Sequence, residues 1–246
     1  MSLRVLQWNI WYNEDIANVV RTLKGIDADV VCLQELTQNY LEQSHSDTVS
    51  YVARQLGFSC HASKPMGRDD VERKQLNAIF SRFPLTNKNQ AWINTPVGTG
   101  GASDEYRAYI EATVLIKGWK VRVATTHMSY VDRFMITDRK KQETDLLVSQ
   151  IEGKSPLILT GDFNAAPDSC TVKHIEQHLR NAGPEYGDNT WTTKPFKYHD
   201  FEENDLNWRL DYIFASEDVK VQSSEIIDTK YSDHLPILAT FQAGGS

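Results

Sequence analysis

Four short apolar runs restrict what this chain of 246 residues can fold into. They are residues 30–33, 78–80, 157–159 and 212–214. Runs of this length are too short for helices, whereas strands that are covered on both faces have this length and composition. Longer segments between the runs repeat apolar residues every three or four positions, as amphipathic helices do. The sequence therefore predicts a mixed fold of buried strands and outer helices.

The same periodicity locates the helices and one hairpin. Helices are predicted at residues 16–23, 49–56, about 137–151 and about 169–179. Polar and apolar residues alternate on both sides of Lys117-Gly118, over residues 109–126, which predicts a β-hairpin. Antiparallel pairing is thus expected beside the helices.

The remaining segments are expected to be loops within one domain. Residues 64–74, 94–105 and 183–204 are rich in Gly, Asp, Asn and Pro, but they lack the length and low complexity of interdomain linkers. A chain of this size can bury roughly 70 to 75% of its unfolded surface without a disulfide or a metal. We therefore expect residues 1–246 to form a single domain and to act as a monomer.

The charge balance and the cysteines exclude several classes of protein. With 26 Lys and Arg against 33 Asp and Glu, the net charge of −7 argues against attachment to nucleic acid by charge alone. No apolar stretch approaches the ~18 residues of a transmembrane segment, and no N-terminal signal pattern is present. Cys32, Cys60 and Cys170 form no C-x-x-C pair, which favours a cytoplasmic or otherwise intracellular location. A signal segment removed before residue 1 also fits the sequence.

Polar residues that can bind a cation or move a proton stand at the ends of the predicted strands. They are Asn9, Glu35, His127, Asp162, Asn164, Asp211, Asp233 and His234. Each one alone has an ordinary alternative as a solvated turn residue, an Asx turn or a cap. Independent turns would not be expected to share one coherent set of chemical roles, so we expect a single shared site.

Seven sequence blocks occur in an order that resembles the endonuclease/exonuclease/phosphatase superfamily, which has the deoxyribonuclease-I-like fold. The blocks are Trp8-Asn9, Leu33-Gln34-Glu35, residues 78–84, Thr126-His127, residues 161–164, residues 210–214 and residues 232–236. The resemblance implies an α/β (α+β) fold, a two-sheet β-sandwich flanked by helices on both outer faces, with residues 1–246 as one catalytic domain. It also implies Mg²⁺-dependent hydrolysis of phosphate esters at one rim.

The candidate metal ligands are oxygen donors. The carboxylate of Glu35 and the side-chain oxygen of Asn9 suit Mg²⁺ or Mn²⁺ rather than zinc. Two ligands suffice, because Mg²⁺ keeps several waters and takes phosphate oxygens of the substrate. By resemblance, Asp233 is a further position near the metal.

The remaining strand-end residues can supply the acid–base chemistry of phosphate ester hydrolysis. Asp162 can accept the proton of the attacking water, and Asn164 can donate to a phosphate oxygen or hold that water. A protonated His234 can supply positive charge opposite the phosphate. The resemblance implies that Asp211 orients His234 and that His127 is a second donor to the phosphate. The residue types leave open whether Asp162 or the His234–Asp211 pair activates the water.

Other polar residues carry less information. Members of the superfamily often place phosphate-contacting side chains where Asn77 and Arg107 stand, but turn hydrogen bonds or surface ion pairs fit both residues equally well. His174 and His178 are four positions apart on a predicted helix, as in half of a zinc site. No third ligand accompanies them, so a solvated helix face is expected.

The leading hypothesis is a metal-dependent phosphoesterase whose substrate is a phosphodiester or a phosphomonoester. The quoted blocks resemble 5′-tyrosyl-DNA phosphodiesterases, so nucleic-acid ends or a tyrosyl-DNA linkage are candidate substrates. Alternatives are a non-specific endonuclease and an inositol-phosphate or sphingolipid phosphoesterase. A non-catalytic binding module of the same fold should lack a ligand or an acid–base residue, and none is missing. Because Lys and Arg are scattered, we expect the site to take one phosphate rather than a long duplex.

Overall fold

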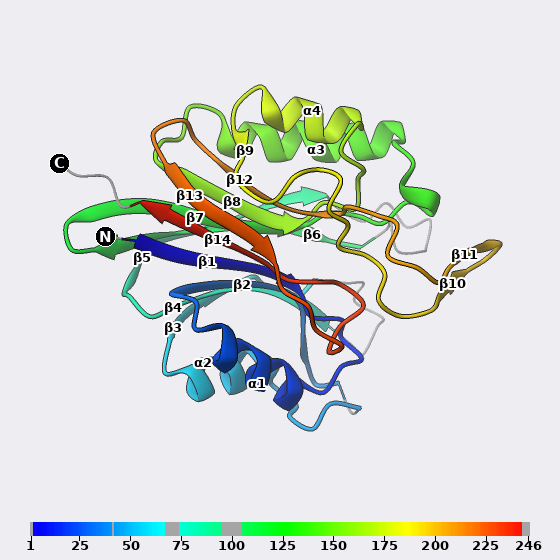
Figure 1. Ribbon diagram of the computed structural model, residues 1–246, viewed down its shortest axis with the longest axis horizontal. Helices are drawn as coiled ribbons and strands as arrows, with labels where there is room; N and C mark the ends of the chain where they lie inside the picture. Colours follow the sequence, from blue (N-terminus) through cyan, green and yellow to red (C-terminus); the bar gives the residue numbers. More distant parts are fainter. Residues whose placement is uncertain (1, 41, 67–73, 95–104, 243–246) are drawn as a thin grey trace.

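The computed structural model describes residues 2–40, 42–66, 74–94 and 105–242, and within them it contains two six-stranded sheets packed face to face (Figure 1). The first sheet consists of β1 (Ser2–Asn9), β2 (Val30–Gln38), β3 (Ser59–Ala62), β4 (Lys74–Ser81), β13 (Lys220–Ile226) and β14 (Ile237–Gln242). Its spatial order is β13-β14-β1-β2-β4-β3. Among the described residues of this sheet, β1 and β2 pair in parallel and the other neighbouring strands pair antiparallel.

The second sheet repeats this plan. It consists of β5 (Leu85–Asn94), β6 (Arg107–Ile116), β7 (Trp119–His127), β8 (Leu157–Asp162), β9 (Arg180–Asn181) and β12 (Asp211–Ala215). Its order is β5-β6-β7-β8-β12-β9, and β7 and β8 are parallel. The predicted hairpin is confirmed: β6 and β7 pair up to Ile116 and Trp119, and both turn residues between them have positive φ.

Helices cover both outer faces of the sandwich, so the predicted architecture is confirmed (Figure 1). The helices are α1 (Ile16–Ile26), α2 (Thr48–Leu56), α3 (Asp138–Ile151) and α4 (Cys170–Glu176). Each begins after a side chain that accepts a backbone N–H of its first turn: Asp15, Asp47, Thr137 and Ser169. In the described ranges no helix is both long enough and apolar enough to cross a membrane.

Alternating residues of the central strands face different cores. Leu3 and Val5 of β1 lie in the core between the two sheets, whereas Leu6 and Trp8 lie in the core beneath α1 and α2. A third core of the same kind lies beneath α3 and α4. Because positions two apart share a face, each central strand presents one set of side chains to the opposite sheet.

This inward-facing set changes from apolar to polar along each strand. The sets are Leu3-Val5-Gln7-Asn9 in β1, Val121-Val123-Thr125-His127 in β7, Ile158-Thr160-Asp162 in β8 and, in the reverse direction, Ala215-Ile213-Asp211 in β12. His127, Asp162 and Asp211 are direct neighbours across three adjacent strands. The polar ends therefore gather at one rim of the sandwich.

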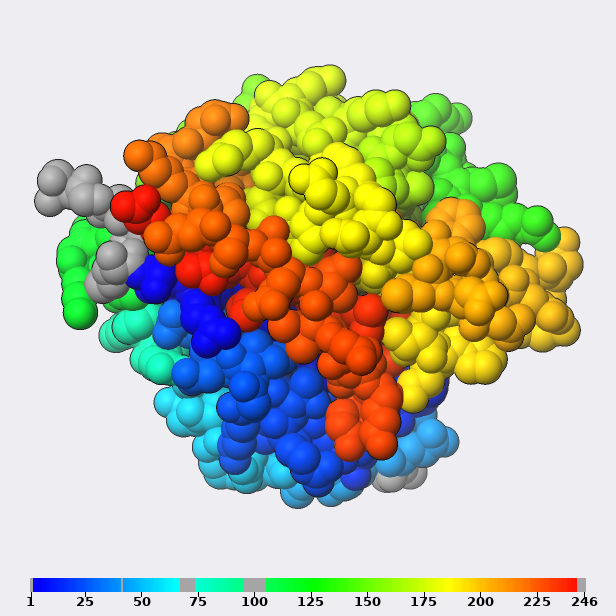
Figure 2. Space-filling model, viewed as in Figure 1, coloured from blue at the N-terminus to red at the C-terminus, as the bar shows by residue number. Residues whose placement is uncertain are grey.

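One predicted loop is wrong in part. Residues 183–204 contain a short hairpin of β10 (Phe196–Tyr198) and β11 (Phe201–Glu203) that forms a separate two-stranded sheet. Strands of three residues are too short to show a period in the sequence. The hairpin projects at the right of the molecule in Figures 1 and 2. The other predicted loops, 64–74 and 94–105, lie largely outside the described residues.

Candidate active site

The polar rim opens into a cavity of about 350 Å³ that is lined by strand-end residues of both sheets. Seven of the predicted site residues line it: Glu35, Arg107, His127, Asp162, Asn164, Asp233 and His234. Asn9 and Asp211 lie directly behind this set and contact it through hydrogen bonds. The fold thus brings together residues that are up to 225 positions apart in the sequence, since Asn9 is residue 9 and His234 is residue 234.

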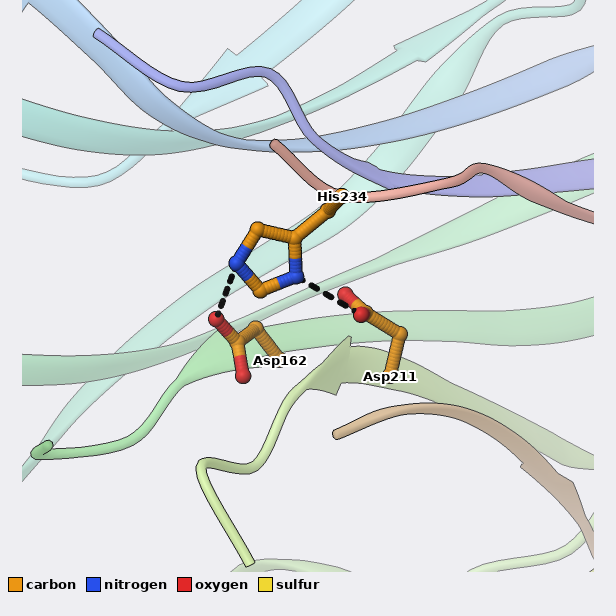
Figure 3. Close-up of side chains that lie close together, drawn as sticks. All are labelled: Asp162, Asp211 and His234. Atoms are coloured by element: carbon orange, nitrogen blue, oxygen red, sulfur yellow. Dashed lines mark hydrogen bonds and ion pairs between the residues drawn. The ribbon is translucent and has the colours of Figure 1, made fainter. Parts of the chain in front are cut away.

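At the centre of the rim, the imidazole of His234 lies between two buried carboxylates (Figure 3). Its Nδ1 lies 2.8 Å from Oδ2 of Asp211, and its Nε2 lies 3.7 Å from Oδ2 of Asp162. Burial alone would lower its pKa, but neighbouring carboxylates, first Asp211 and then Asp162 and Asp233, raise the pKa of the histidine well above its ordinary value. These neighbours therefore favour an imidazolium that donates from Nδ1 to Asp211 and directs its Nε2–H toward Asp162.

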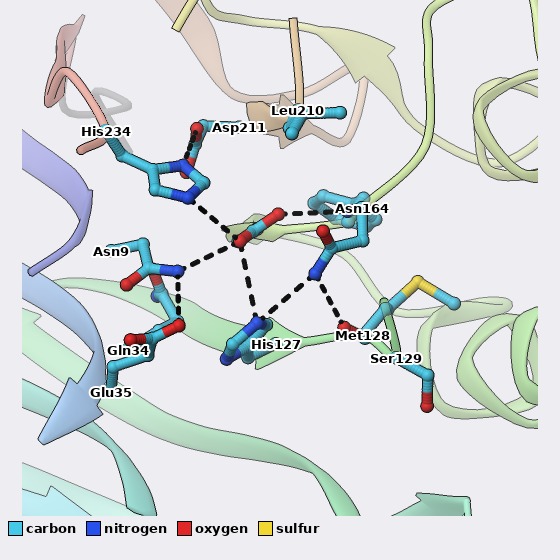
Figure 4. A network of polar contacts seen from close by, with 12 residues as sticks. Asn9, Gln34, Glu35, His127, Met128, Ser129, Asn164, Leu210, Asp211 and His234 are labelled. Atoms are coloured by element: carbon cyan, nitrogen blue, oxygen red, sulfur yellow. Dashed lines mark hydrogen bonds and ion pairs between the residues drawn. The ribbon is translucent and has the colours of Figure 1, made fainter. Parts of the chain in front are cut away.

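The polar contacts of the rim converge on Asp162. Figure 4 shows its partners, Asn9, His127, Asn164 and His234, pointing toward one another. Its Oδ2 accepts a hydrogen bond from Nδ2 of Asn9 at 3.0 Å and lies 3.5 Å from Nε2 of His127. Burial raises the pKa of Asp162, and the charge of His234 opposes that rise. A carboxylate with a raised pKa is a better proton acceptor than an exposed one.

The local sequence around Asp162 explains its position. A Cβ on Gly161 would lie 2.5 Å from the backbone oxygen of Thr126, so only glycine allows β7 and β8 to approach this closely. Asn164 has a φ of 45°, and its backbone N–H donates to Oδ1 of Asp162 at 2.9 Å. The Asx turn considered for this motif is therefore present, and it leaves Oδ2 directed at the other rim residues.

His127 has the opposite electrostatic character to His234. Burial, followed by the charges of Arg107 and His234, holds its pKa well below the ordinary value, so the ring is neutral. Nδ2 of Asn164 donates to the backbone oxygen of Met128 at 3.0 Å and lies 3.3 Å from Nε2 of His127. If Nε2 accepts from Asn164, the proton is on Nδ1. This Nδ1 is buried and has no hydrogen-bond partner among the described residues, although the ring of His127 lines the cavity.

Two carboxylates beside this centre fit a hard divalent cation. Glu35 and Asp233 both line the cavity, and after burial the charge of Glu35 is the main cause that raises the pKa of Asp233. A cation between the two groups would relieve this repulsion. Glu35 has a φ of 63°, at a register shift between Leu33 and Leu36 in the pairing of β2 with β4. Such a bulge redirects a side chain and is common next to active sites.

Asn9 does not present its oxygen to this pair of carboxylates. Its Oδ1 accepts from the backbone N–H of Trp11 at 3.1 Å, while Nδ2 donates to Glu35 at 3.1 Å and to Asp162 at 3.0 Å. In this orientation Asn9 holds the two carboxylates in place. A half turn of the amide would exchange the oxygen and the nitrogen.

A second group has metal-like spacing among the described residues. The candidate ligand atoms of Asp162, Asp211 and His234 lie within 4.8 Å of one another. Because His234 is held between the two carboxylates with its pKa raised, it has no free lone pair for a cation. The arrangement of this trio suits proton chemistry, and the carboxylates of Glu35 and Asp233 suit a cation.

The two residues predicted to contact substrate differ in position. Arg107 is buried, lines the cavity and pairs with Glu105 at 2.9 Å. Asn77 lies inside β4 rather than beside a loop; it is fully buried and donates to the backbone oxygen of Ala108 at 3.1 Å. It is not one of the residues that line the cavity. His174 lies outside the site on α4, 3.4 Å from Asp145.

Several residues that support the site were not predicted. Gln7 and Gln34 exchange two side-chain hydrogen bonds of 2.8 and 2.9 Å, and Gln7 also donates to Oδ1 of Asp211 at 3.0 Å. Gln34 donates in turn to Thr125 at 2.8 Å. Gln7 and Thr125 stand two positions before Asn9 and His127, respectively. Residues two apart in a strand face the same side, so this spacing could have placed both side chains on the face of the site.

Helix α3 supplies a second unpredicted support. Nζ of the buried Lys140 donates to the backbone oxygens of Ser129 and Phe163, both at 2.8 Å. One turn further along, Glu143 accepts the backbone N–H of Ser129 at 2.9 Å. These contacts connect the segments that follow β7 and β8, which carry His127 and Asp162.

Comparisons with known proteins agree with this fold. The model of the Endonuclease/Exonuclease/phosphatase family matches residues 6–234. An endonuclease/exonuclease/phosphatase from Beutenbergia cavernae is similar in structure, with a TM-score of 0.79, 21% identity, and coverage of 99% of this chain and 72% of the other. The human Nocturnin catalytic domain with bound sulfate has a TM-score of 0.72 at 22% identity, with coverage of 98% and 93%.

A phosphatase with a named substrate is among the similar structures. The mannosyl-6-phosphatase Bt3783 of Bacteroides thetaiotaomicron has a TM-score of 0.68 at 17% identity, with coverage of 98% of this chain and 99% of the other. Among curated protein sequences none matches this chain. At these identities the similar structures establish a shared fold.

Proposed function

This chain belongs to the endonuclease/exonuclease/phosphatase family, and from that premise we propose that it is a Mg²⁺- or Mn²⁺-dependent hydrolase of phosphate esters. The family contains hydrolases that act on phosphate esters. The observation that carries the proposal is the convergence on Asp162 of Asn9, His127 and the His234–Asp211 pair, beside the carboxylates of Glu35 and Asp233. We take residues 1–246 to act as one catalytic domain, because β1 and β14 pair in the same sheet.

The cation would be held by Glu35 and Asp233, with Asn9 beside them. When bound, a divalent cation neutralises negative charge on the phosphate oxygens. Both carboxylates line the same cavity as the proton-transfer residues, so the phosphate and the cation would share one site. Arg107 lines that cavity as well and is the candidate for a further contact to phosphate. Asn77 would act at most from behind the site, since it does not line the cavity.

Asp162 is our candidate for the general base. Both nitrogens of His234 face carboxylates, so His234 is placed to donate protons rather than to accept one from water. The candidate proton acceptor is then the carboxylate of Asp162, which lines the cavity and can take a proton from a water aligned for in-line attack. His234 would stabilise the charge that develops on the phosphate, and Asp211 would hold the imidazole in orientation.

His127 and Asn164 complete the donors around the phosphate. The neutral His127 has a buried Nδ1 without a partner among the described residues, and this nitrogen can donate to a phosphate oxygen. Asn164 holds His127 and the backbone of Met128 through its amide. Together these groups can bind one phosphate, whereas the described residues of the lining form no continuous basic groove for nucleic acid.

The test is a panel of phosphate esters, each assayed with Mg²⁺, Mn²⁺ and EDTA. The panel contains mono- and diester nitrophenyl phosphates, oligonucleotides with free, blocked and 5′-tyrosyl ends, inositol phosphates, hexose phosphates and sphingomyelin vesicles. We expect hydrolysis with either cation and none with EDTA. The variants Asp162→Asn and His234→Ala should each lower kcat by on the order of 10² to 10⁴ with little change in Tm. His174→Ala is the matched control outside the site and should keep the full rate.

Two outcomes would overturn the proposal. Undiminished turnover in EDTA would exclude the cation, and undiminished turnover of both variants would exclude this site. Binding of phosphate without hydrolysis of any ester would instead favour a non-catalytic module of the same fold. Cleavage of end-blocked duplex as the preferred reaction would favour a non-specific endonuclease.

A further inference from the structure

The cavity at the rim has two chemically different sides. One side carries the carboxylates and histidines described above, and the other is a wall of aromatic rings. The wall consists of Tyr130, Phe134, Trp191, Phe196 and Tyr198, while Tyr12 lines the cavity beside Glu35, to which its backbone N–H donates at 3.0 Å. A site for phosphate alone has no use for such a surface, because phosphate binds donors and cations.

The aromatic wall begins directly beside the proton-transfer residues. The ring centroids of His234 and Trp191 are 6.3 Å apart, and those of Trp191 and Phe196 are 4.9 Å apart. Tyr130 lies 6.1 Å from Phe196 and 5.6 Å from Tyr198, again between ring centroids. A ligand with its phosphate at His234 would therefore place the next few atoms of its substituent against these rings.

Only part of the wall is needed to stabilise the fold. Phe134 and Trp191 are buried and form a small core with Phe201 and Leu210. Phe196 and Tyr130 are half-buried, and Tyr198 is 37% exposed while still lining the cavity. The outer rings thus keep apolar faces open toward the site, which is the usual character of a ligand pocket.

The hairpin that carries the wall has two distinct faces. Phe196 and Tyr198 of β10 alternate with Lys197, so Lys197 is on the opposite face of the strand. Lys197 pairs across the hairpin with Glu202 of β11. The hairpin therefore presents rings to the site and an exposed ion pair to solvent.

The charges of the cavity limit the ligand to one phosphate. Besides the groups around Asp162, the described residues of the lining include Glu35, Glu105 and Asp233, whereas Arg107, which pairs with Glu105, is the one cationic residue among them other than His234. A second phosphate beyond the reacting one would meet carboxylates or aromatic rings. Neither compensates the loss of its hydration.

We infer that the aromatic wall is the subsite for the substituent of the substrate, and that the substrate is a phosphate ester carrying a flat aromatic ring within a few bonds of its only phosphate. This inference rests on the proposed function, because it names the substrate class of that site. A nucleobase and a tyrosyl group both provide such a ring. Stacking of one ring on aromatic side chains stabilises binding by roughly 1 to 3 kcal/mol, which corresponds to about 5- to 150-fold in Kd.

The test measures binding of phosphonates, which are not hydrolysed, to the wild-type protein with Mg²⁺ present. Calorimetry should give a Kd for benzylphosphonate that is about ten-fold or more below those of methylphosphonate and cyclohexylmethylphosphonate. A nucleoside 5′-phosphonate, a phosphonomethyl-phenylalanine peptide and a hexose 6-phosphonate then distinguish a base, a tyrosyl ring and a sugar. Either the nucleoside 5′-phosphonate or the phosphonomethyl-phenylalanine peptide should bind more tightly than the hexose 6-phosphonate.

Variants of the hairpin locate the effect. Tyr198→Ala and Phe196→Leu should each weaken benzylphosphonate by about five-fold or more and leave methylphosphonate unchanged. Lys197→Ala, on the opposite face of the same strand, is the matched control and should change neither Kd. Because Tyr198 is 37% exposed, its removal should leave the fold intact, which Tm verifies.

Two outcomes would overturn the inference. Equal affinity for the benzyl, cyclohexylmethyl and methyl phosphonates would exclude recognition of a ring, and tightest binding of the hexose derivative would assign the wall to sugars. Either result leaves hydrolysis in the substrate panel unaffected, so the proposed function would still stand. Absence of any hydrolysis in that panel would remove the proposed function instead.

Discussion

At the scale of single residues, the site depends on buried amides that orient charged groups. Oδ2 of Asp211 faces His234 while Oδ1 accepts from Gln7, so both oxygens of this carboxylate are held. Gln7 is itself held by the reciprocal pair of hydrogen bonds with Gln34. A buried network in which each member is satisfied has one preferred geometry, and it transmits that geometry to the imidazole.

Replacing Gln7 should separate catalysis from stability. Gln7→Met leaves Oδ1 of Asp211 without this donor, so kcat should fall by about 10- to 100-fold through misorientation of His234, with little change in KM. The free energy of unfolding should fall by about 1 to 3 kcal/mol. Steady-state kinetics and urea unfolding measure the two effects.

Thr160→Val is the matched control for this substitution. Thr160 also faces the opposite sheet, and its hydroxyl donates to the backbone oxygen of Ala124 at 3.1 Å without contacting the catalytic set. It should lose about 1 kcal/mol of stability and keep its kcat. An unchanged kcat in Gln7→Met, with comparable loss of stability, would show that Gln7 supports only the fold.

At the scale of secondary-structure elements, α3 fixes the ends of two strands through a buried lysine. The Nζ of Lys140 holds the backbone oxygens of Ser129 and Phe163, and no other side chain in the described residues donates to either oxygen. Burial lowers the pKa of Lys140 to about 8, against the opposing effects of Glu143 and Asp162. The helix therefore influences the positions of His127 and Asp162 without contacting substrate.

The Lys140→Met variant should be less stable, and the difference should grow with pH. At pH 7 the loss should be about 2 kcal/mol, because buried carbonyls lose their donor. The folded wild-type chain releases the Lys140 proton near pH 8 and the unfolded chain near 10.5, so the unfolded chain binds more protons between these values. The contribution of Lys140 to the free energy of unfolding of the wild-type protein therefore rises between pH 8 and 10.5, by about 3 kcal/mol at most.

Urea unfolding of both proteins at pH 7, 8, 9 and 10 measures this difference. Thr160→Val serves as the control, because the hydrogen bond of its hydroxyl to the backbone oxygen of Ala124 does not involve Lys140 or its charged neighbours. Its difference from wild type should stay nearly constant over the same range. A stability difference between wild type and Lys140→Met that shrinks as pH rises would contradict the lowered pKa.

At the scale of the whole molecule, the net charge and the location of the hydrophobic cores bear on the proposed binding of substrate and cation. The net charge is −7, and the cavity draws on a few donors rather than on a stripe of cations. The three large cores lie between and outside the sheets and consist of apolar side chains. Folding should therefore not require the cation, and long nucleic acids should gain little from charge.

Salt dependence of binding tests this picture. Asp162→Asn protein should bind oligonucleotides with a log–log slope shallower than about −2 when the concentration of Mg²⁺ is held constant, since few phosphates are neutralised. Free-ended single strands should bind better than end-blocked duplex. A slope of about −5 or steeper on end-blocked duplex would indicate many phosphate contacts and would favour an endonuclease that tracks along DNA.

Much of this molecule could be predicted from its sequence. Runs such as residues 157–159 and the helical repeat of residues 16–23 reflect local burial, and local burial leaves a period in the chain. The strand-end residues were identified because they interrupt these runs, and the structure brings them to one rim. The two sheets, the outer helices and the β6–β7 hairpin follow from the same signals.

Other features depend on which elements meet in space, and no local pattern encodes this. The contacts of Gln7 with Asp211, of Lys140 with Phe163 and of Trp191 with His234 join residues on different elements. The sequence alone does not distinguish a buried polar residue that supports a site from one that only satisfies hydrogen bonds within the fold. The chain's own sequence thus determined the strands, the helices and the candidate chemistry, because these depend on neighbours along the chain. Tertiary packing alone decided which amide, lysine and aromatic ring lie against those residues, because the contacts join segments far apart in sequence.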